Sequence, residues 1–206
     1  MLAYNESSGR FTIGKTLTTP DDPARAVQTG VGQLVQDAGA KPTDVEQIVH
    51  GTTLVTNALI ERKGAKTALI TTEGFRDALE IAREHRYDLY DLFLELPKPL
   101  VPRSLRFELN ERVFADGSIH KALDDAEVID LIQQLQADGI EAVAVSLIHS
   151  YQNPAHERRV AELLAEHAPE MIVSISSDVV PELREYKRTS TTVANVHVRP
   201  IIVHYL

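Results

Sequence analysis

Apolar and polar residues follow two spacings along this chain, one typical of helices and the other of strands. Between residues 22 and 39, apolar residues recur at helical spacing, with Asp22 and Pro23 before them and Gly39 after them. This pattern predicts a capped helix. Similar patterns predict helices over 56–62, 75–84, 125–138, from 154 onward and over 181–198. Apolar or alternating runs predict strands over 11–17, 48–49, 65–71, 105–114, 119–123, 140–148 and 172–175.

The order of these elements predicts the fold class. Strands that alternate with helices form right-handed βαβ units, so we expect an α/β protein with a mostly parallel sheet flanked by helices. The nearly continuous apolar run at 140–148 is typical of a strand covered on both faces. Asp116-Gly117 is a hairpin turn signal, which predicts a β-hairpin insert at about 105–123. We expect one domain over 1–206 rather than two.

Composition narrows the function classes. The chain has 206 residues, of which 43% are hydrophobic, enough for a substantial core. The formal charge of −9 comes from acidic residues spread along the chain, which argues against a nucleic-acid surface. No cysteine is present, which excludes disulfides and thiolate metal sites. No apolar run approaches the roughly 20 residues of a membrane span. We expect a cytoplasmic protein without a nucleic-acid or membrane partner.

The stretch from Val45 to Gly64 combines a short apolar run, a polar turn and a helix pattern. The turn is His50-Gly51-Thr52-Thr53. At the carboxyl edge of a sheet these groups would face a ligand, or else the threonines only cap the helix. Gly64 is expected to take positive φ at the end of that helix.

Two other segments carry candidate polar chemistry. The run from Arg83 to Asp91 is rich in ionisable groups, which either clamp a carboxylate or phosphate or form an internal Arg–Asp network. The helix predicted over 181–198 is rich in Ser and Thr, so its hydroxyls should face another helix or a ligand cleft. His149 follows a predicted strand, whereas His156 and His167 are expected to face solvent on a helix. The GxGxxG, HExxH and GxSxG patterns are absent from the sequence.

Several blocks of sequence, in the same order, resemble the N-terminal region of the hydantoinase A / 5-oxoprolinase family. The first block is HGTTLVTNALIERKGAKTALITTEGFRDALEIAREHRYDLYDL. The later blocks are NERVFADG, AVAVSLIHSYQNPAHERRV and SSDVVPELREYKRTSTTVANVHVRP. The resemblance runs from about Thr16 to Leu206.

The resemblance implies a fold and a reaction. Members of this family share an actin/Hsp70/sugar-kinase-like fold, with two ribonuclease-H-like lobes and an ATP cleft between them. They include ATP-dependent 5-oxoprolinases, N-methylhydantoinases and acetone or acetophenone carboxylase subunits. The chain is therefore similar to the N-terminal lobe of an ATP-dependent hydrolase that acts on hydantoin- or 5-oxoproline-type cyclic amides, with ATP and Mg²⁺ as cofactors. The alternatives are a lobe of a carboxylase subunit and a non-catalytic lobe that acts only by pairing with a second chain.

The same resemblance implies which residues face substrate or phosphate. The turn His50-Gly51-Thr52-Thr53 is expected to face the cleft. Further candidates lie in matching blocks: Asn57, Arg83, Arg86, Asp88, Arg188 and Thr189. The resemblance assigns no catalytic residue and no metal ligand.

The sequence also departs from the family pattern. The DxGGTxTD phosphate hairpin that opens family members is not found, and neither is the second lobe with its phosphate and adenosine motifs. The resemblance therefore implies an incomplete lobe, shortened at its front, with unpaired strand edges. As expected partners it implies the missing second lobe or a hydantoinase B-type subunit, and it implies that this chain alone is catalytically deficient.

Overall fold

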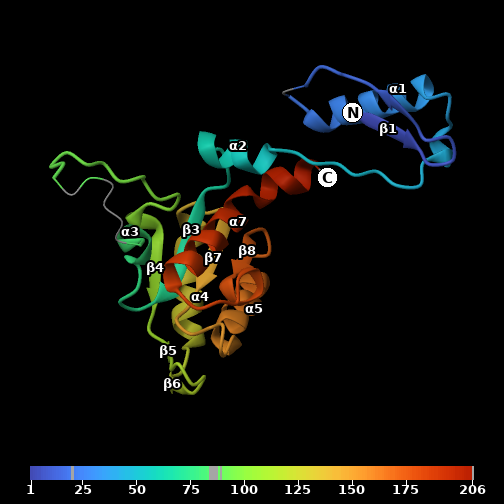
Figure 1. Ribbon diagram of the computed structural model, residues 1–206. Coiled ribbons are helices and arrows are strands. Elements are labelled where there is room, and N and C mark those ends of the chain that lie inside the picture. The colour runs from blue at the N-terminus through green and yellow to red at the C-terminus, as the bar shows by residue number, and fades with distance from the viewer. Residues whose placement is uncertain (20, 84–87, 89, 206) are drawn as a thin grey trace. The chain divides into compact units, whose positions relative to one another are not determined.

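The computed structural model describes residues 1–206 except 20, 84–87, 89, 206 and the side chain of 204. Contacts divide the chain into two compact units (Figure 1). The small unit comprises Met1–Leu54 with Ile201–Leu206, and the large unit comprises Val55–Pro200.

The small unit contains a hairpin and a helix. Strands β1 (Leu2–Asn5) and β2 (Arg10–Ile13) pair antiparallel, so the strand expected over 11–17 is shorter and has a partner that the sequence pattern did not indicate. Helix α1 (Pro23–Asp37) begins where it was expected, because the Asp22 carboxylate accepts a hydrogen bond from the Arg25 backbone N–H at 3.3 Å. Gly39 follows the helix with φ +68°.

The strand expected at 48–49 is not formed, and that prediction is wrong. Ile48 and Val49 are 62% and 88% exposed and belong to no strand. An apolar pair becomes a strand only where a neighbouring backbone offers hydrogen bonds, and no described segment pairs with this stretch. Helix α2 (Leu54–Glu61) then follows as expected.

The large unit is built on a four-stranded sheet in the order β4-β3-β7-β8, with every pair parallel (Figure 1). Its strands are β3 (Thr67–Thr72), β4 (Arg106–Leu109), β7 (Ala142–Ser146) and β8 (Ile172–Ile175). Every residue of the central strands β3 and β7 is buried, as the continuous apolar runs predicted. The expected α/β fold with a parallel sheet flanked by helices is confirmed.

Helices cover both faces of this sheet. Helices α4 (Asp125–Ala137) and α5 (Ala155–His167) pack on the face that carries Ile70 and Val143. Helix α7 (Glu185–Tyr205) and the short α3 (Ala78–Ile81) pack on the face that carries Leu69 and Ala144. Because successive strand residues point to opposite faces, Leu69 and Ile70 belong to different halves of the core.

Several elements of the large unit differ from their predicted extents. The strand expected over 105–114 is two strands, because β4 joins the main sheet and only β5 (Arg112–Val113) pairs with β6 (Ile119–Lys121) as a hairpin. The helix expected over 75–84 is reduced to the four residues of α3. A short α6 (Ser176–Val179) precedes α7, which starts and ends later than expected. Among the described residues, no helix is both long enough and apolar enough to cross a membrane.

Gly64 is required for a different reason from the one expected. Its φ is not positive, and Arg62 takes the left-handed conformation instead, at φ +53°. A Cβ added at Gly64 would lie 2.5 Å from the backbone oxygen of His197 and still closer to the His197 ring. The glycine therefore permits α7 to approach the chain just before β3, where Ala65 N–H donates to the same His197 oxygen at 3.0 Å.

Candidate functional site

Hydroxyl side chains lie buried where β3 and β7 end. Thr71 Oγ1 donates to the backbone oxygen of Ser146 at 2.9 Å, and Ser146 Oγ lies 2.8 Å from Thr189 Oγ1 on α7. All three residues are at most 3% exposed. Open α/β sheets bind ligands at this carboxyl edge, and Thr189, a candidate named by the family resemblance, lies there. Its hydroxyl faces the sheet.

A buried acid–base pair lies at the same edge. His156 Nδ1 is 2.6 Å from Glu111 Oε2, and Thr72 Oγ1 donates to the other carboxylate oxygen. The Ile148 backbone N–H in turn donates to Thr72 Oγ1 at 3.0 Å. The pair joins the ends of β3, β4 and β7 to the first turn of α5.

The expectation that His156 faces solvent is wrong, because this side chain is only 9% exposed. The apolar spacing of α5 did indicate that His156 is buried. His156 precedes Val160 by four residues and Leu163 by seven, so it lies on the same helix face as these two core residues. His167 is exposed, as expected.

Glu157 is fully buried and its carboxylate is well satisfied. It accepts hydrogen bonds from Leu147 N–H at 2.8 Å, Ser176 Oγ at 2.6 Å and Ser177 N–H at 2.8 Å. A buried carboxylate with these donors links the loop after β7 to the start of α6. Sequence reasoning did not single out Glu157.

Arg188 is buried at 1% exposure in the first turns of α7. One guanidinium nitrogen, Nη2, donates to the Leu147 backbone oxygen at 2.6 Å, and the group lies over the Tyr151 ring at 5.5 Å. Nε and Nη1 have no hydrogen-bond partner among the described residues. Burial lowers the pKa of Arg188, against the opposing effect of nearby Glu157. The predicted substrate-facing residue is therefore beneath the surface, beside Leu147 at the end of β7.

The turn expected to face a cleft, residues 50–53, is exposed and precedes α2. Thr52 Oγ1 accepts a hydrogen bond from the N–H of Leu54, the first residue of α2, at 3.2 Å, which is a local turn contact just before the helix. His50 Nε2 contacts the Tyr205 hydroxyl within the small unit. Asn57 lies exposed on α2, and His149 lies beyond β7 with φ +58°.

The run of ionisable residues after α3, from Arg83 to Asp91, is described only at residues 83, 88, 90 and 91. Arg83 is exposed and lines a hollow with residues at the start of α7. The Asp88 carboxylate accepts a hydrogen bond from Tyr90 N–H at 3.0 Å, which is a local turn contact. Arg86 lies outside the described residues.

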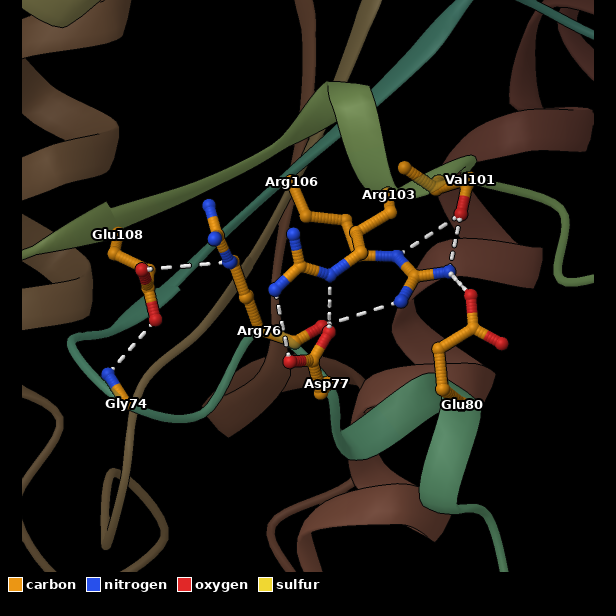
Figure 2. A network of polar contacts seen from close by, with 8 residues as sticks. All are labelled: Gly74, Arg76, Asp77, Glu80, Val101, Arg103, Arg106 and Glu108. Atoms are coloured by element: carbon orange, nitrogen blue, oxygen red, sulfur yellow. Dashed lines mark hydrogen bonds and ion pairs between the residues drawn. The ribbon is translucent and has the colours of Figure 1, made fainter.

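An ion-pair network that the sequence pattern did not indicate holds α3 against the segment before β4 (Figure 2). Its members are Gly74, Arg76, Asp77, Glu80, Val101, Arg103, Arg106 and Glu108. The Arg106 side chain is fully buried, with Nη2 2.9 Å from Glu80 and Nε donating to the Val101 oxygen at 3.0 Å. The Arg103 guanidinium beside Asp77 holds the pKa of that carboxyl below its usual value. This network fixes the short helix α3, which ends two residues before Arg83.

A family model described as the hydantoinase/oxoprolinase N-terminal region matches residues 1–168. The chain belongs to this family. The match includes the first fifteen residues, which lie before the sequence blocks that carried the resemblance.

Three relatives show how far the similarity extends. The crystal structure of the ATP-dependent caprolactamase from Pseudomonas jessenii matches with a TM-score of 0.87 and 35% identity, over 98% of this chain and 30% of that one. A nucleotide-free structure of acetone carboxylase matches with a TM-score of 0.82 and 27% identity, over 96% and 31%. The 5-oxoprolinase 1 of Arabidopsis thaliana is 33% identical, over 88% of this chain and 16% of its own length. The chain thus spans about 30% of the first relatives that it matches.

The described carboxylate and histidine side chains do not fit a metal site. Within the described part of the chain, no group of three or more His, Asp or Glu side chains could hold a metal ion. Glu111 and Glu157, the fully buried carboxylates at the sheet edge, are already committed to protein donors. We therefore assign no Mg²⁺ ligand to these residues and derive no reaction step through Mg²⁺ or ATP.

Proposed function

We propose that this chain is the N-terminal lobe of an ATP-dependent hydrolase that opens cyclic amides of the hydantoin or 5-oxoproline type. One observation carries the proposal: 98% of the chain matches an ATP-dependent caprolactamase at a TM-score of 0.87. A likeness of that extent at 35% identity covers the whole parallel sheet together with its flanking helices.

The contribution of this lobe would be a rigid wall at the carboxyl edge of the sheet. Thr71, Ser146 and Thr189 are joined there by short hydrogen bonds, and Glu111 with His156 ties the neighbouring strand ends together. Pre-organised polar groups of this kind hold their geometry while charge develops on a substrate. The turn at 50–53 and Arg83 remain candidate contacts for substrate or phosphate.

The remainder of the active site would come from a partner. We propose a second lobe or a hydantoinase B-type subunit as this partner, with ATP and Mg²⁺ bound where the two meet. Relatives named as subunits, such as caprolactamase subunit alpha and acetone carboxylase beta subunit, support a multi-subunit assembly. The 206-residue chain alone should then be catalytically deficient.

The carboxylase branch is the second candidate, and it is favoured by the match to acetone carboxylase at a TM-score of 0.82. In that case the same lobe would belong to an enzyme that carboxylates a ketone. The lower identity, 27% against 35%, is why we place it second. A lobe that is only a pairing module is the non-catalytic alternative.

Complementation of ATP hydrolysis separates these functions. ATP turnover is measured for the chain alone, and after it is mixed with a caprolactamase alpha subunit that lacks its own copy of this region. We expect no substrate-dependent turnover from the chain alone, and turnover stimulated by 5-oxoproline or hydantoin in the mixture. Stimulation only by acetone with bicarbonate would select the carboxylase branch. Cyclic-amide-dependent turnover by the chain alone would overturn the partner requirement.

A further inference from the structure

A hollow lies between the end of α3 and the start of α7. Its lining residues are Arg83, Glu182, Leu183, Arg184 and Lys187. Its volume is about 420 Å³, which falls within the roughly 300–1,000 Å³ typical of small-molecule sites. Neither Arg184 nor Lys187 was a candidate from the sequence.

The lining carries excess positive charge, although the chain as a whole is at −9. Lys187 Nζ lies 2.5 Å from Glu182 Oε2, so these two charges neutralise one another. The guanidinium groups of Arg83 and Arg184 remain, and Arg184 forms no ion pair with any other described residue. A planar guanidinium presents paired donors that match a carboxylate or phosphate.

The backbone on both sides of the hollow is strained. Arg184 has φ +83°, and Ala82, the residue before Arg83, has φ +51°. A non-glycine residue in the left-handed region costs about 1–3 kcal/mol and persists only where its surroundings hold it. On the α3 side, Arg106 provides that support by binding Glu80 at 2.9 Å. Arg184 therefore takes a costly backbone conformation itself, and Arg83 directly follows a residue that takes one.

We propose that this hollow is a binding site for a small oxyanion, either a carboxylate or a phosphate group, gripped by Arg83 and Arg184. Lys187, in the first turn of α7, also lines the hollow. The site deepens the proposed function, on which its link to a substrate rests, because Arg83 is a candidate contact for substrate or phosphate there. Binding of an oxyanion in the hollow is argued separately, from the charge and geometry of its lining.

Calorimetric titration of the 206-residue chain tests the site with three probes. Inorganic phosphate supplies the phosphate chemistry, 5-oxoproline supplies a carboxylate on a cyclic amide, and ε-caprolactam is a cyclic amide without charge. We expect saturable binding of at least one anion, weakened by added salt because the groups are exposed, and no binding of caprolactam at this hollow. The tighter anion identifies the source of the oxyanion.

Arg184→Gly is the decisive variant, because glycine accepts φ +83° without strain while the guanidinium is lost. We expect its Kd for the anion to rise about tenfold or more, from loss of a charge-assisted bond, with a melting temperature equal to or above that of the parent. Arg184→Lys should retain part of the affinity. Arg158→Gln is the matched control, since Arg158 is exposed on α5 and pairs with no described residue; it should leave the Kd unchanged.

Either of two results would overturn the site. One is the absence of saturable binding for both anions, and the other is an equal Kd in the parent chain and Arg184→Gly. These outcomes are independent of the complementation assay, because they are read as binding by the chain alone. Absence of anion binding would not contradict the proposed hydrolase function, and absence of turnover in the complementation assay would not contradict the binding site.

Discussion

Adding a single methyl group at Gly64 tests how closely α7 packs on the sheet. The Cβ of Gly64→Ala would lie 2.5 Å from the backbone oxygen of His197, which already accepts the Ala65 N–H at 3.0 Å. A flexible side chain could turn away, but a backbone oxygen moves only with its helix.

The cost can be estimated from this geometry. Overpacking a tight contact costs about 1–3 kcal/mol, and weakening the Ala65–His197 hydrogen bond adds about 1 kcal/mol. We therefore expect Gly64→Ala to lower the free energy of unfolding by about 2–4 kcal/mol. In a chain of this size that lowers the melting temperature by roughly 5–15 °C.

Urea and thermal unfolding followed by circular dichroism measure this loss. Gly32→Ala is the control, because a Cβ at this exposed position in α1 meets nothing within 4 Å. It should be neutral or stabilising, since alanine is the better helix former. A Gly64→Ala variant within about 0.5 kcal/mol of the parent, the usual range for harmless surface changes, would refute the close approach.

Three further predictions concern single side chains. Burial lowers the pKa of His197 below its unfolded value of about 6.5. The stability contributed by neutral His197 should therefore be complete above about pH 6.5 and be lost as the pH falls below that value. His197→Gln should flatten this pH dependence of the free energy of unfolding, whereas His167→Gln, at an exposed position, should not. Thr52→Val should cost about 0.5–1.5 kcal/mol by removing the hydrogen bond that Leu54 N–H donates, and Thr52→Ser should preserve this bond. Equal melting temperatures for all three chains would contradict a stabilising contact at this turn. Arg188→Met should stay within about 1 kcal/mol of the parent, because it removes a desolvated guanidinium with two nitrogens that no described residue pairs with. Arg188→Ala should cost about 2–4 kcal/mol, because it leaves a cavity. A larger loss of stability for the Met variant than for the Ala variant in chemical denaturation would contradict this reasoning.

Local signals in the sequence predicted much of the large unit. Helix α4 follows its Asp124 cap, and β7 is buried on both faces as its apolar run indicated. These features depend on neighbours in sequence, so a single chain reveals them. The strand at 48–49 failed because a ladder partner is not a local property, and β4 was assigned to a hairpin because its true partner, β3, lies more than thirty residues earlier.

The polar edge of the sheet was harder to predict for the same reason. Glu157 follows the Asn153-Pro154 start signal and looks like an ordinary surface residue of a first helical turn, yet it is buried against distant segments. Arg106 reads as a polar residue in a strand, and only the fold brings it to Glu80 and Val101. The family resemblance named Thr189 as a candidate without indicating that its hydroxyl packs on Ser146.

The product formed by the complemented enzyme tests the central claim most directly. The chain, mixed with a caprolactamase alpha subunit lacking this region, is incubated with ATP and 5-oxoproline or hydantoin, and both ADP and the organic product are quantified by chromatography. The account predicts a ring-opened product that accumulates in proportion to ADP and requires this chain. ADP release without ring opening, or a product formed equally well when this chain is omitted, would contradict it.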